Sequence, residues 1–430
     1  MNKTTPKILV SSVDPWSDMV GSDTLTSLLE QFDNSVIASI NIRAKKSDSK
    51  VAGKYFHVIE DRVIKSILSP SVITGESYFP ERSSTLLNDD EEREDKRYGK
   101  KYLWNRWILV LVREVLWKLG HWRSKELDSF IDNFSPDVLF FPIESYIHFN
   151  RINLYIIKKF HPKRVIGYMW DDNFTYKQYP YNPLYILHRM WLRRGVCRLI
   201  KHCDNVFAIT PKMKRELDAS FHIESVLLTK PIKMVLDPVS LVFHKPIKLL
   251  YTGKLVIGRD KTIADIVDAI RVVNKNSQRV ILDVYSGTTL TPQMHSRINV
   301  PGACNLKGFI SQKEVLDEQK KADVLLFVES LSKKDMSARL SFSTKITDYL
   351  SVGKCIWAVG NKDLAPIDYF KEEDAAIVSC TKEDILIQLK AIVDNGDAIP
   401  TYARKARECG IKNHNQQNIQ TCFKKAIIGE

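Results

Sequence analysis

The sequence predicts an α/β protein of two domains, each with a parallel sheet and helices packed against it. Three observations predict this class. The chain has 430 residues, about three times a common domain length. Short apolar runs alternate with helical segments in both halves. A segment broken by three prolines, residues 229–248, separates the two halves.

The first half contains four short apolar runs that we predict to be buried strands. Their lengths and their richness in β-branched and aromatic residues favour strands over helices. The runs are residues 7–13, 137–142, 165–169 and 206–210.

The second half repeats the alternation more clearly. A helix is predicted over 261–274, because its isoleucines and valines recur on one face. Ser311 and Glu314 form a capping-box signature for a further helix. The remaining elements of this half are strands at 247–251, 280–285, 324–328 and 355–359 and a helix at 343–352.

These patterns predict the domain boundaries. The first domain spans 1–232 and is expected to bind an acceptor. A linker covers 233–246, and the second domain spans 247–400. The last segment, 401–430, is predicted to be helical and to pack back toward the first domain.

The composition is that of a soluble protein with an anionic partner. Hydrophobic residues make up 44% and charged residues 27%, enough apolar material for two cores. The net charge of +13 favours a nucleotide, a phospholipid head group or a nucleic acid. The seven cysteines form no CxxC pair and are expected to be free thiols. We find neither a membrane-spanning run nor a signal-peptide pattern, so we expect a cytoplasmic location.

Several site motifs are absent. The chain has no GxGxxG, no GxxxxGK[ST] and no HExxH pattern. It also has no two aspartates at positions i and i+2, the pattern that would clamp a metal ion. We therefore expect neither a metal nor a bound cofactor.

The most informative segment begins a predicted helix at Ser343. The first-turn amides of Ser343, Thr344 and Lys345 would point outward at the positive end of the helix dipole, which suits an anion. Asp348, one turn later, could accept hydrogen bonds from two vicinal ribose hydroxyls. The alternative is a capped core helix that ends at Gly353.

A second segment places three cations in a glycine-bearing loop after a strand. Gly253, Lys254, Arg259 and Lys261 suit a diphosphate held by backbone amides and charged side chains. The alternative is a basic surface loop. Because both segments follow parallel strands, they are expected at the sheet edge where open α/β folds bind ligands. Together they favour a nucleotide.

The order of landmarks in the second half resembles GT-B glycosyltransferases, especially family 4 and its polysaccharide-synthesis relatives. The resemblance covers 249–360, and the first half matches more loosely through PDVLFFP, GYMWDDN and DNVFAITPKMKREL. It implies two Rossmann-like α/β domains with a central cleft. The landmarks of the second half are LDVYSG, NLKGF, KADVLLFVES, STKITDYLSVGKCI and WAVG.

The resemblance also implies roles for particular residues. Lys254 and Arg259 would hold the diphosphate of a sugar nucleotide, and Asp348 would hold its ribose. Phe309 and Ile310 would contact the base. Many relatives carry two acids separated by seven residues.

Asp348 takes the second of these two places, and Leu340 stands at the first. Glu329 is then the nearest acid that could face the donor sugar.

Catalytic candidates in the first half follow a predicted strand. Asp171 or Asp172 could take the proton of an acceptor hydroxyl, and the alternative is that either one caps a turn. Relatives use a glycine-containing loop after the first strand to approach the donor phosphates, and Gly21 stands in that place. His148 and His161 are expected on the surface.

Two basic aromatic segments, 100–119 and 181–198, suit the surface of an anionic membrane. The alternative is that the apolar stripe of the first segment packs onto the sheet. The stripe consists of Trp104, Ile108, Leu111, Val115 and Leu119.

The sequence thus predicts a metal-independent glycosyltransferase with a nucleotide-sugar donor. The resemblance implies a lipid-linked glycan as acceptor, as in capsule or O-antigen assembly, with peripheral attachment to the inner face of the cytoplasmic membrane. One alternative is a sugar-nucleotide 2-epimerase on the same fold, which needs no acceptor. Another is a nucleic-acid-binding protein. We rank it last and expect no nucleic-acid partner, because the basic residues are scattered rather than clustered.

Overall fold

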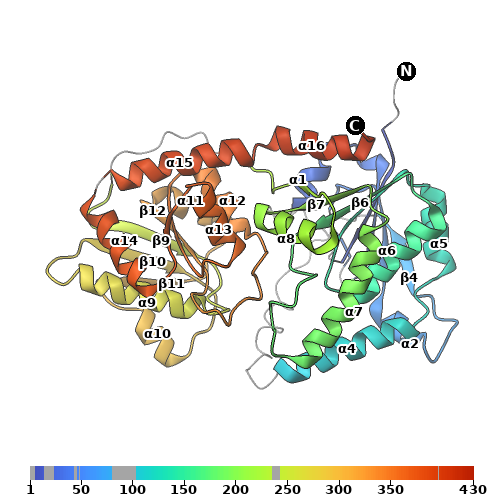
Figure 1. Ribbon diagram of the computed structural model, residues 1–430, viewed down its shortest axis with the longest axis horizontal. Coiled ribbons are helices and arrows are strands. Elements are labelled where there is room, and N and C mark those ends of the chain that lie inside the picture. The colour runs from blue at the N-terminus through green and yellow to red at the C-terminus, as the bar shows by residue number, and fades with distance from the viewer. Residues whose placement is uncertain are drawn as a thin grey trace. The chain divides into compact units, whose positions relative to one another are not determined.

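The computed structural model describes residues 5–13, 24–42, 46–47, 49–79, 103–234, 243–395 and 397–430. The chain forms two compact units, each with its own sheet, which confirms the predicted α/β class (Figure 1). Unit 1 comprises Met1–Ile209, Met213–Leu228 and Gln420–Glu430. Unit 2 comprises Thr210–Lys212 and Thr229–Ile419.

Unit 1 is built on an eight-stranded sheet in the order β4-β3-β2-β1-β5-β6-β7-β8. Its strand pairs are parallel except for β3 with β4. The strands are β1 (Ile8–Ser12), β2 (Ile37–Asn41), β3 (Lys54–Val58), β4 (Gly75–Tyr78), β5 (Val138–Pro142), β6 (Arg164–Met169), β7 (Asn205–Ala208) and β8 (Val226–Leu227). The helices are α1 (Thr24–Leu29), the 3-10 turn η1 (Asn34–Val36), α2 (Glu60–Lys65), α4 (Leu103–Leu119), α5 (Lys125–Phe134), α6 (Ile147–Phe160), α7 (Pro183–Ile200) and α8 (Pro211–Phe221).

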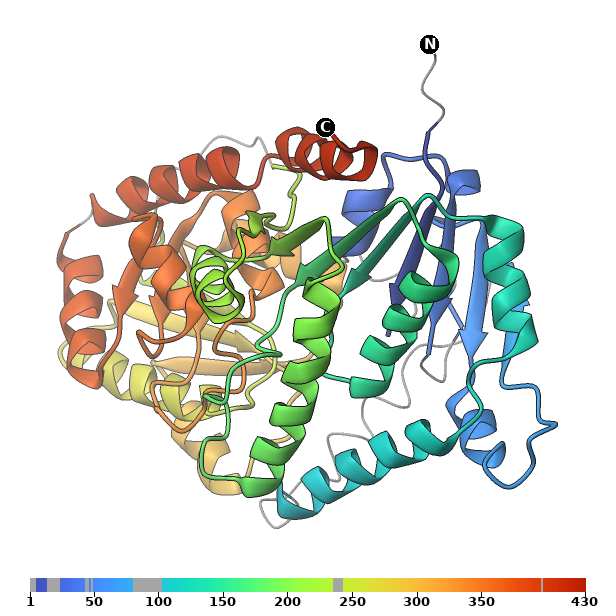
Figure 2. The ribbon, with the colours of Figure 1, turned by 45° about the vertical axis from the view of Figure 1, so that its right-hand side comes forward.

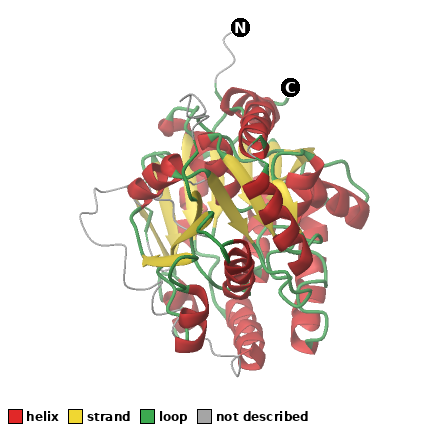
Figure 3. Ribbon diagram, turned by 90° about the vertical axis from the view of Figure 1, so that its left-hand side faces the viewer, coloured by secondary structure: helices red, strands yellow, loops and turns green. Residues whose placement is uncertain are grey.

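The four strands predicted in the first half are confirmed as β1, β5, β6 and β7. Each is almost fully buried, as expected for parallel strands covered by helices on both faces. Figure 3 shows the strands of the chain in yellow among its helices. The last helix, α16 (Gln416–Ile428), contributes residues 420–430 to unit 1. There the backbone carbonyl of Ala426 accepts a hydrogen bond from Arg164 Nε at 2.9 Å, at the start of β6.

Unit 2 is built on a six-stranded, wholly parallel sheet in the order β11-β10-β9-β12-β13-β14. The strands are β9 (Ile247–Thr252), β10 (Val280–Tyr285), β11 (Cys304–Gly308), β12 (Val324–Val328), β13 (Cys355–Val359) and β14 (Ile377–Ser379). The helices are α9 (Arg259–Val273), α10 (Pro292–Ile298), α11 (Gln312–Lys321), α12 (Thr344–Val352), α13 (Ala365–Glu372), α14 (Lys382–Asp394) and α15 (Ala398–Asn413).

The core of unit 2 lies between its sheet and α9, α10 and α14, and α12 packs with α11 and α15. The four strands predicted in this half are confirmed. The capping box before α11 is confirmed too, because Ser311 and Glu314 exchange the expected bonds. All seven cysteines are free, as predicted. No helix within the described ranges combines the length and apolar character that a bilayer span requires.

Candidate functional site

The sheet of unit 2 changes direction beside β9. The chain runs from β9 outward to β10 and β11, and then returns to place β12 on the other side of β9. The loops that follow β9 and β12 therefore diverge at one point of the sheet edge. Open α/β sheets bind ligands at such a point.

Two glycines shape the loop after β9. Gly253 has a φ of +136°, and a Cβ there would overlap the Nζ atom of Lys345. Gly258 has a φ of +77° and directly precedes α9, where a Cβ would overlap the Asp335 carboxylate. These backbone angles and close approaches require glycine at both positions. The backbone therefore runs close to the side chains that reach it from β12 and α12.

A bidentate ion pair across this point joins the half-buried Arg259 to the buried Glu329. Arg259 Nε and Nη2 donate to the Glu329 carboxylate at 3.0 and 2.8 Å. Burial disfavours the charge, but Glu329 outweighs that effect and raises the pKa of Arg259 above its ordinary value. Glu329, at the end of β12, thus holds the guanidinium in place.

Lys345 lies beside this pair on the first turn of α12. Its Nζ atom donates to the Tyr251 hydroxyl at 3.2 Å and sits 4.4 Å from the centre of the Tyr251 ring. Burial, together with the neighbouring charge of Arg259, lowers the pKa of Lys345 to about 7. Two cations are therefore held close together, so their mutual repulsion favours an anion between them.

The rest of α12 adds further polar groups. Ser343 occupies the N-cap position as predicted, but its hydroxyl makes no capping hydrogen bond, and Thr344 is exposed. The first-turn amides therefore gain no partner from that side chain. Asp348 follows one turn later, where burial raises its pKa against the opposing charges of Lys230 and Lys345.

The other predicted residues of unit 2 lie on its surface. Lys254 and Lys261 are exposed, and the Lys254 carbonyl accepts a hydrogen bond from the Tyr251 hydroxyl at 2.9 Å. Phe309 follows β11 and its side chain is 80% exposed, with Ile310 half-buried beside it. These positions border the sheet edge but make no described contact with Arg259 or Lys345.

The predicted acids of unit 1 lie in the turn after β6. Asp172 is buried, and its carboxylate accepts hydrogen bonds from the amide of Thr175 at 3.0 Å and from its hydroxyl. This is the turn-capping arrangement given above as the alternative. Asp171 is half-buried beside it. Gly21 lies outside the described residues.

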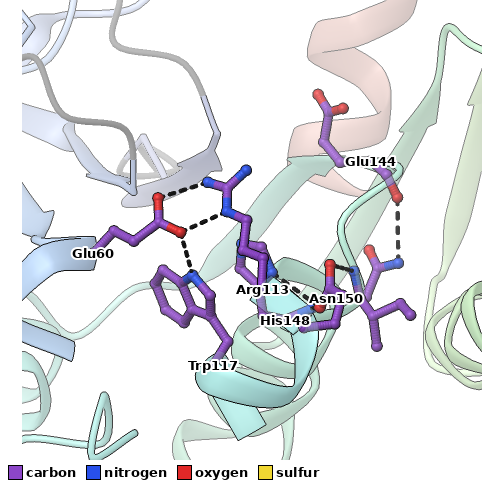
Figure 4. Close-up of polar contacts among 8 residues, drawn as sticks. Glu60, Arg113, Trp117, Glu144, His148 and Asn150 are labelled. Carbon is purple, nitrogen blue, oxygen red and sulfur yellow. Dashed lines mark hydrogen bonds and ion pairs between the residues drawn. The ribbon is translucent and has the colours of Figure 1, made fainter. Parts of the chain in front are cut away.

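Unit 1 has its own change of direction, between β1 and β5. Glu144 follows β5 at this point, and in Figure 4 its carboxylate points away from the neighbouring polar network. We did not single out this residue from the sequence. An acid two positions after the predicted strand 137–142 was the available signal.

The expectation that His148 is a surface residue is wrong, whereas His161 is exposed as expected. His148 is 1% exposed and its Nδ1 atom lies 3.0 Å from Glu114 Oε2 (Figure 4). Its ring stacks on Trp117 at 4.3 Å. The reason for the error is tertiary: the Glu114 partner belongs to α4, more than thirty residues earlier in the chain.

Comparison with solved structures identifies the fold. HepE of Anabaena in complex with UDP and glucose is 8% identical, with a TM-score of 0.59 over 98% of this chain and 100% of that chain. The apo structure of OtsA is 9% identical, with a TM-score of 0.58 over 98% and 99%. A UDP-forming trehalose-phosphate synthase from Burkholderia vietnamiensis is 8% identical, with a TM-score of 0.57 over 99% and 100%.

The chain has the GT-B fold. This confirms the resemblance at the level of fold, since the likeness extends over nearly the whole chain. No protein-family profile and no curated protein sequence matches the chain. Within the described ranges, no three His, Cys, Asp or Glu residues gather in a way that could hold a metal ion.

Proposed function

We propose that the protein is a glycosyltransferase that uses a nucleotide-sugar donor. The observation that carries the proposal is the arrangement of Arg259 and Lys345 beside the N-terminus of α12, at the point where the sheet of unit 2 changes direction. Two cations and a helix N-terminus at such a point suit a diphosphate. HepE was solved with UDP and with UDP-glucose, which supports a uridine diphosphate donor.

The remaining donor contacts follow from the same arrangement. The diphosphate lies between the Gly253–Lys261 loop and the Ser343–Lys345 turn. Asp348 binds the ribose, and Phe309 with Ile310 contacts the base. Glu329 positions Arg259 for the phosphate and bounds the space for the donor sugar.

The reaction breaks the bond between the anomeric carbon and the phosphate oxygen. A new bond forms from that carbon to the acceptor oxygen, and the hydroxyl proton passes to a base. Arg259 and Lys345 neutralise the departing diphosphate, so the proposed mechanism needs no metal. Asp171, Asp172 and Glu144 are the candidate bases in unit 1. The hydrogen bonds to Asp172 make it the weakest of the three.

We propose a lipid-linked glycan as acceptor, as in capsule or O-antigen assembly. Segments 100–119 and 181–198 support this choice, because both are basic and rich in aromatic residues. The enzyme would then act as a peripheral protein at the inner face of the cytoplasmic membrane.

Thermal unfolding with a panel of nucleoside diphosphates and sugar nucleotides tests the donor site. A ligand that binds only the folded state raises the melting temperature. We expect a selective, EDTA-insensitive rise with one nucleotide. No rise with any nucleotide would refute the proposal. Conversion of the donor without an acceptor would indicate an epimerase instead.

A further inference from the structure

Helix α4 packs against the rest of unit 1 with the side that carries Arg113, Glu114 and Trp117, here called its polar side because all three donate or accept hydrogen bonds there. Glu114 and Trp117 are buried, at 2% and 0% exposure. The opposite side, at positions 108, 112, 115 and 119 of one helical stripe, is apolar and open to solvent. The exposed apolar residues among the described side chains of α4, here called the α4 face, are Ile108, Leu109, Val112, Val115 and Leu119. Of the stripe predicted from the sequence, Ile108, Val115 and Leu119 are exposed, so these three residues do not pack onto the sheet as the alternative required. Leu111 is half-buried, and the side chain of Trp104 lies outside the described residues.

Specific polar contacts fix this orientation. Glu60 accepts hydrogen bonds from Arg113 Nη2 at 2.7 Å and from Trp117 Nε1 at 3.0 Å (Figure 4). Glu114 accepts the backbone amides of Ile147 and His148 at 3.0 and 2.8 Å. A buried carboxylate is tolerated only when it is bonded in this way. Folding of unit 1 therefore requires the polar side inward and leaves the α4 face outward.

A hollow beside the α4 face, between α4, α6 and α7, is lined by cations. Its volume is about 320 Å³, and the three helices pack together (Figures 1 and 2). The described residues that line it include no acid. The four cations that line it are Lys118, Arg151, Arg194 and Arg198.

Within the described part of the chain, none of these four side chains forms an ion pair. Burial and the nearby charge of Arg123 lower the pKa of Arg151, against the opposing charge of Glu114. A second hollow shares Arg151 with the first and is also lined by Arg123, Lys158 and Lys159, of which Lys159 is paired with Asp128 at 2.6 Å. The surface beside the α4 face thus carries concentrated positive charge.

The lining of the cationic hollow also includes one buried polar residue. Asn150 lines it, is 1% exposed, and has a carbonyl oxygen with no hydrogen-bond partner. Its amide nitrogen donates to the backbone carbonyl of Glu144 at 3.3 Å. A buried acceptor of this kind suits a hydroxyl donor on a bound molecule. The hollow therefore offers cations for a phosphate, with an unpaired buried acceptor in its wall.

We infer that this region docks onto an anionic phospholipid membrane, with the α4 face in the acyl boundary and a lipid phosphate in the cationic hollow. Exposed apolar residues beside basic residues are the combination that interfacial helices use. A second copy of the chain is a poorer occupant, because a symmetric contact would bring two cationic hollows together. The inference rests on the membrane acceptor of the proposed function and adds the surface that reaches it.

Vesicle flotation of the full chain tests the inference. The probes are phosphatidylcholine vesicles with and without phosphatidylglycerol, at low and at high salt. We expect binding only to the phosphatidylglycerol vesicles, weakened by salt. The double variant Arg194→Ala/Arg198→Ala should lower the partition coefficient by about 30-fold. Val112→Gln/Val115→Gln should lower it at both salt concentrations.

Matched controls separate this inference from the donor site. Lys424→Ala/Lys425→Ala removes two exposed cations from α16, at the opposite end of unit 1 in Figures 1 and 2, and should bind vesicles as the wild type does. All variants should keep the nucleotide-induced rise in melting temperature, which also shows that they fold. Equal vesicle binding by Arg194→Ala/Arg198→Ala and wild type would overturn the inference. So would a wild type that binds no vesicles, whether or not it binds inorganic phosphate. Self-association abolished by Val112→Gln/Val115→Gln would identify a second copy as the occupant instead.

Discussion

The candidate donor site of unit 2 and the cationic hollow of unit 1 hold their cations in opposite ways. In unit 2, Arg259 is fixed by Glu329 and Lys345 rests on Tyr251, both inside the sheet edge. In unit 1, Arg194 and Arg198 are exposed, and no ion pair holds them within the described residues. Fixed cations suit one small anion of defined geometry, whereas unfixed cations suit a surface of many phosphates. The same net positive charge therefore supports two kinds of recognition.

The largest expected effect concerns the attachment of α4. Glu114→Ala leaves the amides of Ile147 and His148 without their acceptor inside unit 1. We expect a loss of about 3 kcal/mol in the free energy of unfolding of this unit, measured by chemical denaturation. Lys118→Ala, an exposed change on the same helix, is the control. An unchanged stability in Glu114→Ala would show that the buried carboxylate does not hold the helix.

The next effect concerns the ion pair of unit 2. Arg259→Ala removes the proposed phosphate ligand and leaves Glu329 buried without its partner. We expect the Kd for the preferred nucleoside diphosphate to rise roughly 100-fold in calorimetric titration. Glu329→Gln should raise it less, because Arg259 stays in place. Equal affinities in wild type and Arg259→Ala would remove the diphosphate from this part of the site.

Lys345→Met should weaken nucleotide binding by about tenfold at pH 6. The same change should raise the melting temperature of the ligand-free protein. In the fold the pKa of Lys345 is about 7, below the ordinary lysine value. At a pH between these two values, the unfolded chain therefore binds more protons than the folded chain. The contribution of Lys345 to the free energy of unfolding thus becomes more favourable as the pH rises. The stabilisation by Lys345→Met should thus be larger at pH 6 than at pH 9. The opposite trend would contradict the buried setting of this lysine.

The smallest effect is expected at the exposed cation of the same loop. Lys261→Ala should raise the Kd for the nucleotide by no more than about threefold, since exposed charges are screened. Its dependence on salt should be stronger than that of Arg259→Ala. A loss as large as that of Arg259→Ala would show that the loop closes over the ligand and buries Lys261.

Much of the fold could be predicted from local patterns. The buried runs that became β5 and β12 are continuous apolar segments, which are typical of parallel strands. The edge strand β4 (GESY) has no such signal, because it pairs antiparallel at a partly exposed edge. Its position depends on β3 rather than on its own residues.

For the candidate site, the sequence could predict the residues but not the contacts between them. The sequence indicated Arg259, Lys345 and Glu329 separately, but their pairing joins positions 70 residues apart. The orientation of α4 was equally hidden. The sequence of this helix has an apolar and a polar face. Only the amides of Ile147 and His148, which are distant in sequence and bind Glu114, decide which face turns inward. Periodicity defines the faces of a helix, and tertiary contacts choose between them.

The most direct test of the diphosphate site is the proton uptake that accompanies nucleotide binding. At pH 8, Lys345 with a pKa of about 7 is largely neutral, and a bound diphosphate would favour its charged form. Calorimetric titration of the preferred nucleoside diphosphate in two buffers of different ionisation enthalpy, with EDTA present, measures this uptake. We predict an uptake approaching one proton in the wild type and none in Lys345→Met. Tight binding with no proton uptake in the wild type would contradict the placement of the diphosphate beside Lys345.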